Sequence, residues 1–335
     1  MSDGTGISWA DATWNPIVGC DKVSRGCDHC YAIRTGARIR LRHKGVRVRG
    51  HAVRGGEWTG KVNLLPDRLD QPLRWRWSRR VFVNAQSDLF HKNVPDDFIA
   101  RVFVTMARAP QHVFQILTKR HGRMRSLLSS DDFADRVGWA SMTDSPWPLP
   151  NVWLGVSVED QATADLRIPA LLDTPAAVRW VSAEPLLGPV DLRDYVDRWH
   201  EDDGGTCDWG RCDRAAVAVR RDFAHEDPRH VSMLPVCELH RGLDWVVVGG
   251  ESGPGARPMH PAWARSLRDQ CAATGVPYFF KQWGEWAPED QTPEETVIPA
   301  QYRHDDSTGC MRLGRRVTGD LLDGRQHHEW PDGAP

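Results

Sequence analysis

The sequence lacks the features that mark membrane, secreted and strongly basic proteins. No run approaches the roughly 18 apolar residues of a membrane span, and residues 1–13 lack the basic and apolar segments of a secretory signal peptide. Neither charge sign dominates, because the formal net charge of the 335 residues is −2. We therefore expect a cytoplasmic protein with no membrane partner. Its eight cysteines should be reduced thiols that can bind metals rather than disulfides.

Apolar residues make up 40% of the chain, and many of them recur in short, mostly continuous runs that are typical of buried parallel strands. These runs are Val81–Gln86, Val113–Thr118, Val152–Val158, Val178–Ala183, Trp245–Gly249 and Pro277–Gln282, with Trp14–Val18 as a candidate seventh. Helical spacing is found at Asp96–Arg108 and Pro261–Thr274. Strands that alternate with helices predict an α/β fold. Six or seven strands favour a partial (β/α) barrel over an open doubly wound sheet.

One stretch interrupts this alternation. Residues 196–240 are rich in charge, glycine, histidine and cysteine and predict a small inserted unit. The barrel would then comprise residues 1–195 and 241–290, and the polar residues 291–335 would form a peripheral tail.

The first cysteine cluster has the spacing C-x6-C-x2-C and consists of Cys20, Cys27 and Cys30 on a glycine-bounded loop. Three close thiols in a reduced chain favour a soft metal or an iron–sulfur cluster. Three protein ligands would leave one iron of a four-iron cluster open to another molecule. The alternative is structural zinc, with His29 or a distant residue as the fourth ligand.

The second cluster lies in the insert and consists of Cys207, Cys212, Cys237 and His240. Two chelating pairs joined by a connecting loop match a Cys3His zinc site. Because the insert has little apolar material of its own, a bound zinc would supply its folding energy. His225 and His230 are alternative ligands, an auxiliary iron–sulfur cluster is a further option, and unpaired thiols in a polar loop are the alternative to any metal.

Several strings of the sequence resemble, in order, a phage and prophage family of unknown function whose genes neighbour those of "three-Cys-motif partner" proteins. The strings are ISWADATWNPIVGCDKVSRGCDHCYA, SDLFH, QILTKR, LGVSVED, SAEPLLGP, VVGGESGPGARP and FFKQWGEW. That family is similar in turn to radical S-adenosylmethionine (SAM) enzymes, including spore photoproduct lyase, in its three-cysteine loop and strand–helix order. The resemblance implies a [4Fe–4S] cluster, SAM as cofactor and a three-Cys-motif partner protein. The standard radical SAM loop has three residues between its first two cysteines, where this chain has six.

The resemblance also suggests roles for polar residues that follow the predicted strands. Ser157 and Glu159 would contact the methionine part and the ribose of SAM, and Lys119 and Arg120 its carboxylate. The resemblance gives no role to Glu251, because the Gly-Gly-Glu motif of radical SAM enzymes follows the second strand and Gly249-Gly250-Glu251 comes much later in this chain. From its own chemistry Glu251 could bind a ribose or an amine, and the alternative is a tight strand-to-helix turn.

Two further strand-end residues, Asp88 and His91, would bind substrate or move a proton. The glycine-rich turn ending at Arg257 could cradle an anion. The alternative for each of these residues is a solvated rim position or a salt bridge.

A basic segment follows the first cluster, with eight Lys or Arg and no acid between His29 and Gly56. With Trp58, Trp75 and Trp77 nearby, it could track a phosphate backbone, although such charge runs are often only a solvated face.

The expected function is therefore SAM cleavage to a 5′-deoxyadenosyl radical that acts on a nucleic-acid base or nucleotide. The alternatives are a zinc-stabilised barrel hydrolase and a non-catalytic module that binds nucleic acid or a partner protein.

Overall fold

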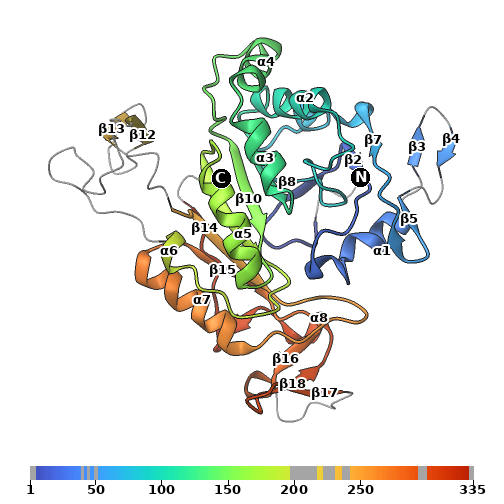
Figure 1. Ribbon diagram of the computed structural model, residues 1–335, viewed down its shortest axis with the longest axis vertical. Helices are drawn as coiled ribbons and strands as arrows, with labels where there is room; N and C mark the ends of the chain where they lie inside the picture. Colours follow the sequence, from blue (N-terminus) through green and yellow to red (C-terminus); the bar gives the residue numbers. More distant parts are fainter. Residues whose placement is uncertain are drawn as a thin grey trace.

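The computed structural model describes residues 5–38, 41–43, 46–48, 52–196, 217–221, 231–235, 242–292 and 300–331. Its centre is one seven-stranded sheet with the order β1-β8-β9-β10-β11-β14-β15, in which every neighbouring pair is parallel (Figure 1). The strands are β1 (Ala12–Trp14), β8 (Arg80–Val83), β9 (Val113–Thr118), β10 (Val152–Ser157), β11 (Val178–Ala183), β14 (Trp245–Gly249) and β15 (Tyr278–Gln282). The sheet curls into a half-barrel. The predicted α/β fold with a partial barrel is confirmed, and six of the predicted runs coincide with strands of this sheet. The candidate seventh run, Trp14–Val18, is misplaced: it meets β1 only at Trp14, and its Ile17–Val18 part forms β2, which lies outside this sheet.

The two faces of the sheet bury different side chains, because successive residues of a strand point to opposite faces. On β10, Leu154 and Val156 belong to the large core between the sheet and its helices. Trp153, between them in alternation, belongs to a second core on the other face. This second core is dominated by large rings, among them Trp9, Phe82, Trp153, Trp180, Trp245 and Phe279. The interior of the half-barrel is therefore filled with aromatic side chains rather than open.

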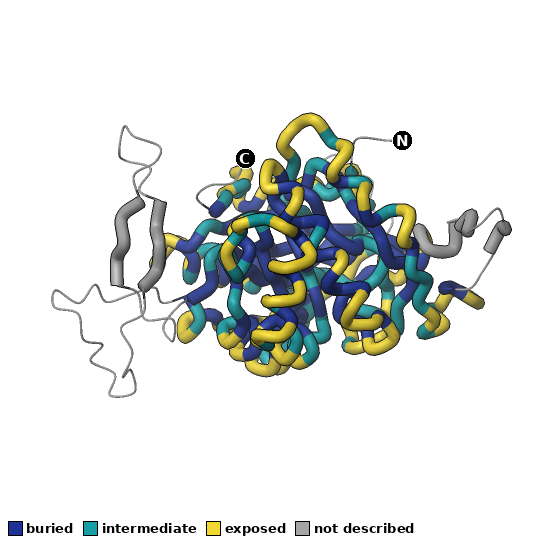
Figure 2. Tube along the Cα trace, turned by 90° about the horizontal axis from the view of Figure 1, so that it is seen from above, coloured by how far each residue is buried: buried dark blue, intermediate teal, exposed yellow. Residues whose placement is uncertain are grey.

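The helices are α1 (Tyr31–Arg38), α2 (Asp96–Ala107), α3 (His121–Leu128), α4 (Asp131–Ser141), α5 (Gln161–Leu172), α6 (Arg193–Val196), α7 (Pro261–Thr274) and α8 (Arg315–Thr318). Helices α2, α3, α5 and α7 come after strands of the sheet and cover its outer face, whereas α4 follows α3 and packs against α2 (Figure 1). Figure 2 shows buried segments in the middle of the described chain and exposed turns around them. Local chemistry sets several helix ends. Asp160 and Thr163 form a reciprocal capping box at the start of α5, and Gly275 ends α7 with a φ of +69°. Both predicted helices are confirmed.

The remaining described elements are short. Antiparallel pairs join β2 (Ile17–Val18) to β7 (Asn63–Leu64), β3 (Leu41–His43) to β4 (Val46–Val48), β5 (Val53–Arg54) to β6 (Glu57–Trp58), β12 (Val217–Arg221) to β13 (Val231–Pro235) and β19 (Leu321–Leu322) to β20 (Arg325–Gln326). A three-stranded sheet has the order β16 (Trp286–Pro288), β18 (Gly309–Arg312), β17 (Gln301–Arg303). Single 3₁₀ turns are η1 (Arg25–Cys27), η2 (Pro66–Arg68), η3 (Pro72–Arg74) and η5 (Glu289–Gln291).

The predicted insert is represented by β12 and β13, which come between β11 and β14 in the chain. Its four candidate zinc ligands, Cys207, Cys212, Cys237 and His240, lie outside the described residues.

The C-terminal segment is built into the sheet. The Phe280 amide donates to His327 O at 2.7 Å, and the Glu329 amide donates to Tyr278 O at 3.2 Å, so this segment runs along the outer edge of β15. Trp330 then stacks on Trp245 with ring centroids 5.0 Å apart. The residues expected to form a peripheral tail thus contribute both backbone pairing and a ring to the inner core.

Among the helices that the structure describes, none has the length and apolarity needed to cross a membrane.

Candidate functional site

The candidate site lies at the carboxyl ends of the strands, where a loop carries the three N-terminal cysteines. We call residues 19–30 the cysteine loop. It begins after β2, where the Gly19 amide donates to Gln86 O at 3.2 Å beyond the end of β8, and it leads directly into α1. Polar side chains from β9, β10 and β14 hold the loop at three points.

The first point is Arg120, which follows β9. Its Nη1 donates to Asp88 Oδ2 at 2.9 Å and lies 3.7 Å from the sulfur of Cys20. Asp88 is buried and also accepts from the Thr118 hydroxyl at 2.8 Å and from the Lys119 amide at 3.1 Å. A carboxylate with this many donors is fixed in place, and it fixes the arginine that faces Cys20.

His91 supports the same corner of the loop. Its Nδ1 accepts from the Asn93 amide at 3.1 Å, which places the proton of a neutral ring on Nε2, 3.2 Å from Asp21 Oδ1. Arg120 also binds the Asp21 carboxylate. Burial and the neighbouring Arg120 charge lower the pKa of His91 below its usual value. The ring is therefore neutral at pH 7.

The second point is Glu159, just beyond β10. Its Oε1 accepts from the Ser24 hydroxyl at 2.7 Å and pairs with Lys119 Nζ at 3.2 Å, and its Oε2 pairs with Arg167 at 3.0 Å. Burial raises the pKa of Glu159, but the charges of Lys119 and Arg167 and the Ser24 hydrogen bond outweigh it and leave the pKa below its usual value. Gly26 packs against this carboxylate so closely that a Cβ there would lie 2.4 Å from Oε1.

The third point is the turn after β14. Arg257 binds Glu251 through two nitrogens, Nε to Oε2 at 2.9 Å and Nη2 to Oε1 at 2.6 Å. The same Nη2 donates to Arg25 O at 2.8 Å, within the cysteine loop. Gly255 of this turn lies against His29, since a Cβ there would be 2.8 Å from the imidazole. The glycine-rich turn, predicted as an anion cradle, contacts the cysteine loop in this structure.

The three thiols form no disulfide and share one electrostatic environment. Burial raises the pKa of Cys20 to about 12, with the Asp88 charge adding to the increase, and burial also raises the pKa of Cys30. The opposing cations are Arg120 for Cys20 and Lys119 for Cys30. Soft thiol donors on one loop, with cations beside two of them, suit a metal centre that deprotonates its ligands.

Within the ranges that the structure describes, no group of three or more His, Cys, Asp or Glu side chains is arranged to hold a single metal ion. Each cysteine of a four-iron cluster binds a different iron, so such a cluster does not require the three sulfurs to converge on one point.

Every candidate site residue that falls in the described ranges lies at this edge of the sheet. The structure brings together Cys20, Cys27, Cys30, Asp88, His91, Lys119, Arg120, Ser157, Glu159 and Glu251 through the contacts above and the hydrogen bond from Arg167 to Ser157 O at 2.7 Å. The three strand-end carboxylates each bind an arginine, which is the salt-bridge alternative considered from sequence. These salt bridges anchor the cysteine loop.

Sequence reasoning missed Ser24, Asp21 and Arg167 as parts of this site. Arg167 had a recognisable signal, because it falls among the buried Ala164, Ile168 and Leu171 on one face of α5. A charged residue on such a face needs a buried partner, which is Glu159. Ser24 and Asp21 had no comparable signal.

The predicted nucleic-acid segment is only partly visible, since most of its side chains fall outside the described residues. Trp58 packs against a small core formed by Val18, Ala52 and Leu65, and Trp75 contacts the His112 ring. Trp77 is exposed.

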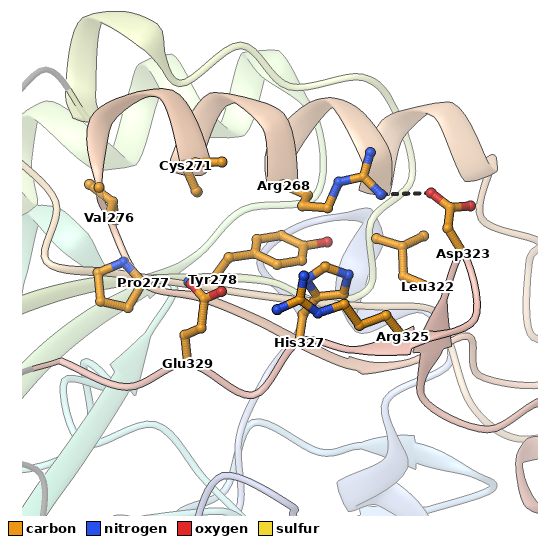
Figure 3. A pocket seen from close by; sticks show the side chains of 12 residues that line it. Arg268, Cys271, Val276, Pro277, Tyr278, Leu322, Asp323, Arg325, His327 and Glu329 are labelled. Carbon is orange, nitrogen blue, oxygen red and sulfur yellow. Dashed lines mark hydrogen bonds and ion pairs between the residues drawn. The ribbon is translucent and has the colours of Figure 1, made fainter.

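A cavity of about 570 Å³ lies elsewhere, between α7 and the C-terminal segment (Figure 3). It reaches Tyr278 at the amino end of β15, whereas the cysteine loop lies at the carboxyl ends of the strands. Arg268 on its rim is bound to Asp323 at 2.6 Å. This cavity is therefore separate from the candidate site.

Comparison with known proteins gives a family. No curated protein and no solved structure matches the chain significantly. One family model, described as "Protein of unknown function (DUF5131)", matches residues 4–331, nearly the whole chain. The expectation of a family of unknown function is thereby confirmed, and the chain belongs to the DUF5131 family.

Proposed function

We propose that this chain is a radical SAM enzyme in which Cys20, Cys27 and Cys30 hold a [4Fe–4S] cluster. The observation that carries the proposal is the anchoring of a three-cysteine loop, through Arg120, at the carboxyl edge of a parallel half-barrel. That edge is where α/β barrels place their reactive sites. When bound, such a cluster would pass one electron from an external reductant to SAM and so supply its cleavage to methionine and a 5′-deoxyadenosyl radical.

The residues around the loop would prepare it for this chemistry. Arg120 and Lys119 stabilise thiolates at Cys20 and Cys30, and Lys119 remains partly accessible to a carboxylate such as that of SAM. Asp88 and His91 act behind them, because both are buried and contact Arg120 and Asp21 respectively. Ser157, Glu159 and Glu251 would frame the cofactor from β10 and β14.

The substrate in this proposal is a nucleic-acid base or nucleotide, in a phage or prophage setting and with a three-Cys-motif protein as partner. The proposal also includes a structural zinc on Cys207, Cys212, Cys237 and His240. Both parts rest on the sequence resemblance and on ligand spacing.

Anaerobic purification followed by iron, sulfide and zinc analysis tests the proposal, together with a SAM-cleavage assay under dithionite. We expect about four irons per chain, with sulfide and 5′-deoxyadenosine as product. Replacing Cys20, Cys27 and Cys30 with alanine should remove iron while leaving any zinc of the insert in place. Zinc without sulfide, and no SAM cleavage, would overturn the proposal and leave a zinc-stabilised barrel.

A further inference from the structure

A second group of side chains lies at the same edge of the sheet and is not used to anchor the cysteine loop. Glu184 follows β11, Lys281 lies on β15, and Tyr31 opens α1 directly after Cys30. Lys281 Nζ lies 2.8 Å from Glu184 Oε1, and the two side chains are 19% and 13% exposed. The pair is thus held in place and still within reach of solvent.

Contacts with Trp9, Gly249 and Ser182 fix the position of the pair. Lys281 Nζ lies 5.8 Å from the centre of the Trp9 ring, which belongs to the inner aromatic core. The Glu184 carboxylate rests on the backbone of β14, where a Cβ at Gly249 would lie 2.6 Å from Oε1. Its other oxygen accepts from the Ser182 hydroxyl at 3.2 Å. The ammonium and the carboxylate therefore present a donor and an acceptor side by side in a defined orientation.

Tyr31 lies at the same edge of the sheet as the Glu184–Lys281 pair. Its hydroxyl donates to Ala85 O at 2.9 Å, beyond the end of β8, which fixes the ring across the edge of the sheet. The side chain is nevertheless 46% exposed. The Tyr31 hydroxyl also lies within electrostatic range of the Cys30 thiol and of the Glu184 carboxylate. Tyr31 thus lies next to the last cysteine of the loop, at the edge of the sheet that carries Glu184 and Lys281, and is partly open to solvent.

The pair differs from the anchoring carboxylates because it can still offer hydrogen-bond donors to a ligand. Asp88 is saturated by several donors, whereas in the described part of the chain Glu184 is the one carboxylate within ion-pair distance of Lys281. An ammonium group has three N–H donors, so Lys281 can offer donors to a ligand. The pair has no net charge and gives no preference for an anion.

We propose that Tyr31, Glu184 and Lys281 form the subsite that recognises the base of the substrate. A nucleobase has adjacent donors and acceptors on its edge, which match Lys281 and Glu184, and a flat face that can stack on Tyr31. Tyr31 is next to Cys30 in the chain, so a base held there lies beside the cysteine loop. The assignment deepens the proposed function, on which it rests for the reaction that the base undergoes.

The test is calorimetric titration of the anaerobically purified full chain with adenosine, guanosine, cytidine and thymidine, with and without saturating SAM. We expect at least one nucleoside to bind in the presence of SAM. Lys281→Met and Glu184→Gln should each weaken its binding about tenfold, the loss of one hydrogen bond to a charged group. Tyr31→Ala should weaken it similarly and Tyr31→Phe much less, because phenylalanine keeps the stacking face.

The double variant Lys281→Met, Glu184→Gln removes both charges together, so that neither is left unpaired. Thermal unfolding of each variant shows whether it is folded, so that weaker binding is not confused with misfolding. Arg136→Met, which removes two exposed ion pairs, to Asp97 of α2 and Asp132 of α4, is the matched control and should bind as the wild type does. SAM affinity should be the same in all variants. Binding of no nucleoside, or equal binding by wild type and variants, overturns the subsite.

Loss of SAM binding in the same variants would assign the three residues to the adenine of SAM and would overturn the substrate assignment. Nucleoside binding does not require a cluster. Nucleoside binding by a chain that contains no iron would therefore reject the proposed function and keep the subsite.

Discussion

The Nη1 of Arg120 lies 3.7 Å from the sulfur of Cys20, so a guanidinium faces the first thiol of the cysteine loop. Burial and the nearby Asp88 raise the pKa of this thiol, and Arg120 opposes them. The balance keeps Cys20 protonated at neutral pH in the metal-free chain. A metal centre bound through Cys20, as proposed, would have to displace that proton.

A pH dependence of stability follows. The pKa of Cys20 is about 12 in the folded chain and about 9 as an ordinary thiol, so between these values the unfolded state binds fewer protons. The free energy of unfolding should be unaffected by this group below pH 9 and should fall as pH rises toward 12, by up to about 1.4 kcal/mol per pH unit. Urea unfolding of the metal-free wild type and of Cys20→Ser across this range measures it. Parallel curves for the two chains would contradict the assignment.

The buried pair of Glu159 and Arg167 should behave as one unit. Both side chains are almost fully buried, at 1% and 2% exposure. Glu159→Gln leaves Arg167 without its carboxylate partner and should lower the free energy of unfolding by about 3–5 kcal/mol. Arg167→Met should cost less, because Glu159 keeps its ion pair with Lys119. The double variant should lose clearly less than the sum of the two. Urea unfolding measures all three.

Arg136→Met is the control for that cycle, because its pairs with Asp97 and Asp132 are exposed. It should change the free energy of unfolding by no more than about 1 kcal/mol. Additive losses for Glu159 and Arg167 would mean that the two side chains are stabilised independently.

The strands of the half-barrel were predictable because strands buried on both faces read as continuous apolar runs. The run Val113–Thr118 matches β9 residue for residue. The gathering of the candidate residues at one edge also followed, since parallel strands bring the residues after their carboxyl ends to the same edge of the sheet. The pairing of charges at that edge did not follow. Whether Glu159 meets a ligand, Lys119 or Arg167 depends on the path of the cysteine loop and the curl of the sheet.

The contacts of the C-terminal segment also could not be predicted from the sequence. Its sequence is polar because it pairs along the edge of β15, where one side of the chain faces solvent. The ring of Trp330 stacks on Trp245. The guanidinium carbon of Arg80 lies 4.0 Å from the centre of the Trp330 ring. Neither contact has a local sequence pattern, because the partners are far apart in the chain.

The inner aromatic core depends on one glycine. A Cβ at Gly155 would lie 2.5 Å from the Trp180 ring, and both residues sit in paired strands that cannot easily separate. Gly155→Ala should therefore lower the free energy of unfolding by about 1–3 kcal/mol through overpacking. Gly138→Ala is the matched control, since nothing lies within 4 Å of a Cβ at that position in α4. Alanine there should raise stability by about 0.5–1 kcal/mol. Thermal unfolding that moved in the same direction for both variants would contradict the packing described for Trp180.

Arg257 should act as a positioning residue for the cysteine loop. Lysine cannot reproduce the two-pronged bond to Glu251 or reach Arg25 O with the same group, so Arg257→Lys should loosen the loop without disturbing the sheet. Hydrogen exchange measured by mass spectrometry should be about tenfold faster in peptides from the cysteine loop, corresponding to a local loss of about 1.4 kcal/mol, and unchanged in β9 and β10. Iron retained after anaerobic purification should fall in parallel. Iron loss with unchanged exchange in the loop would show instead that Arg257 contacts the metal centre or its ligand directly, whereas faster exchange throughout the chain would show that the residue serves general stability.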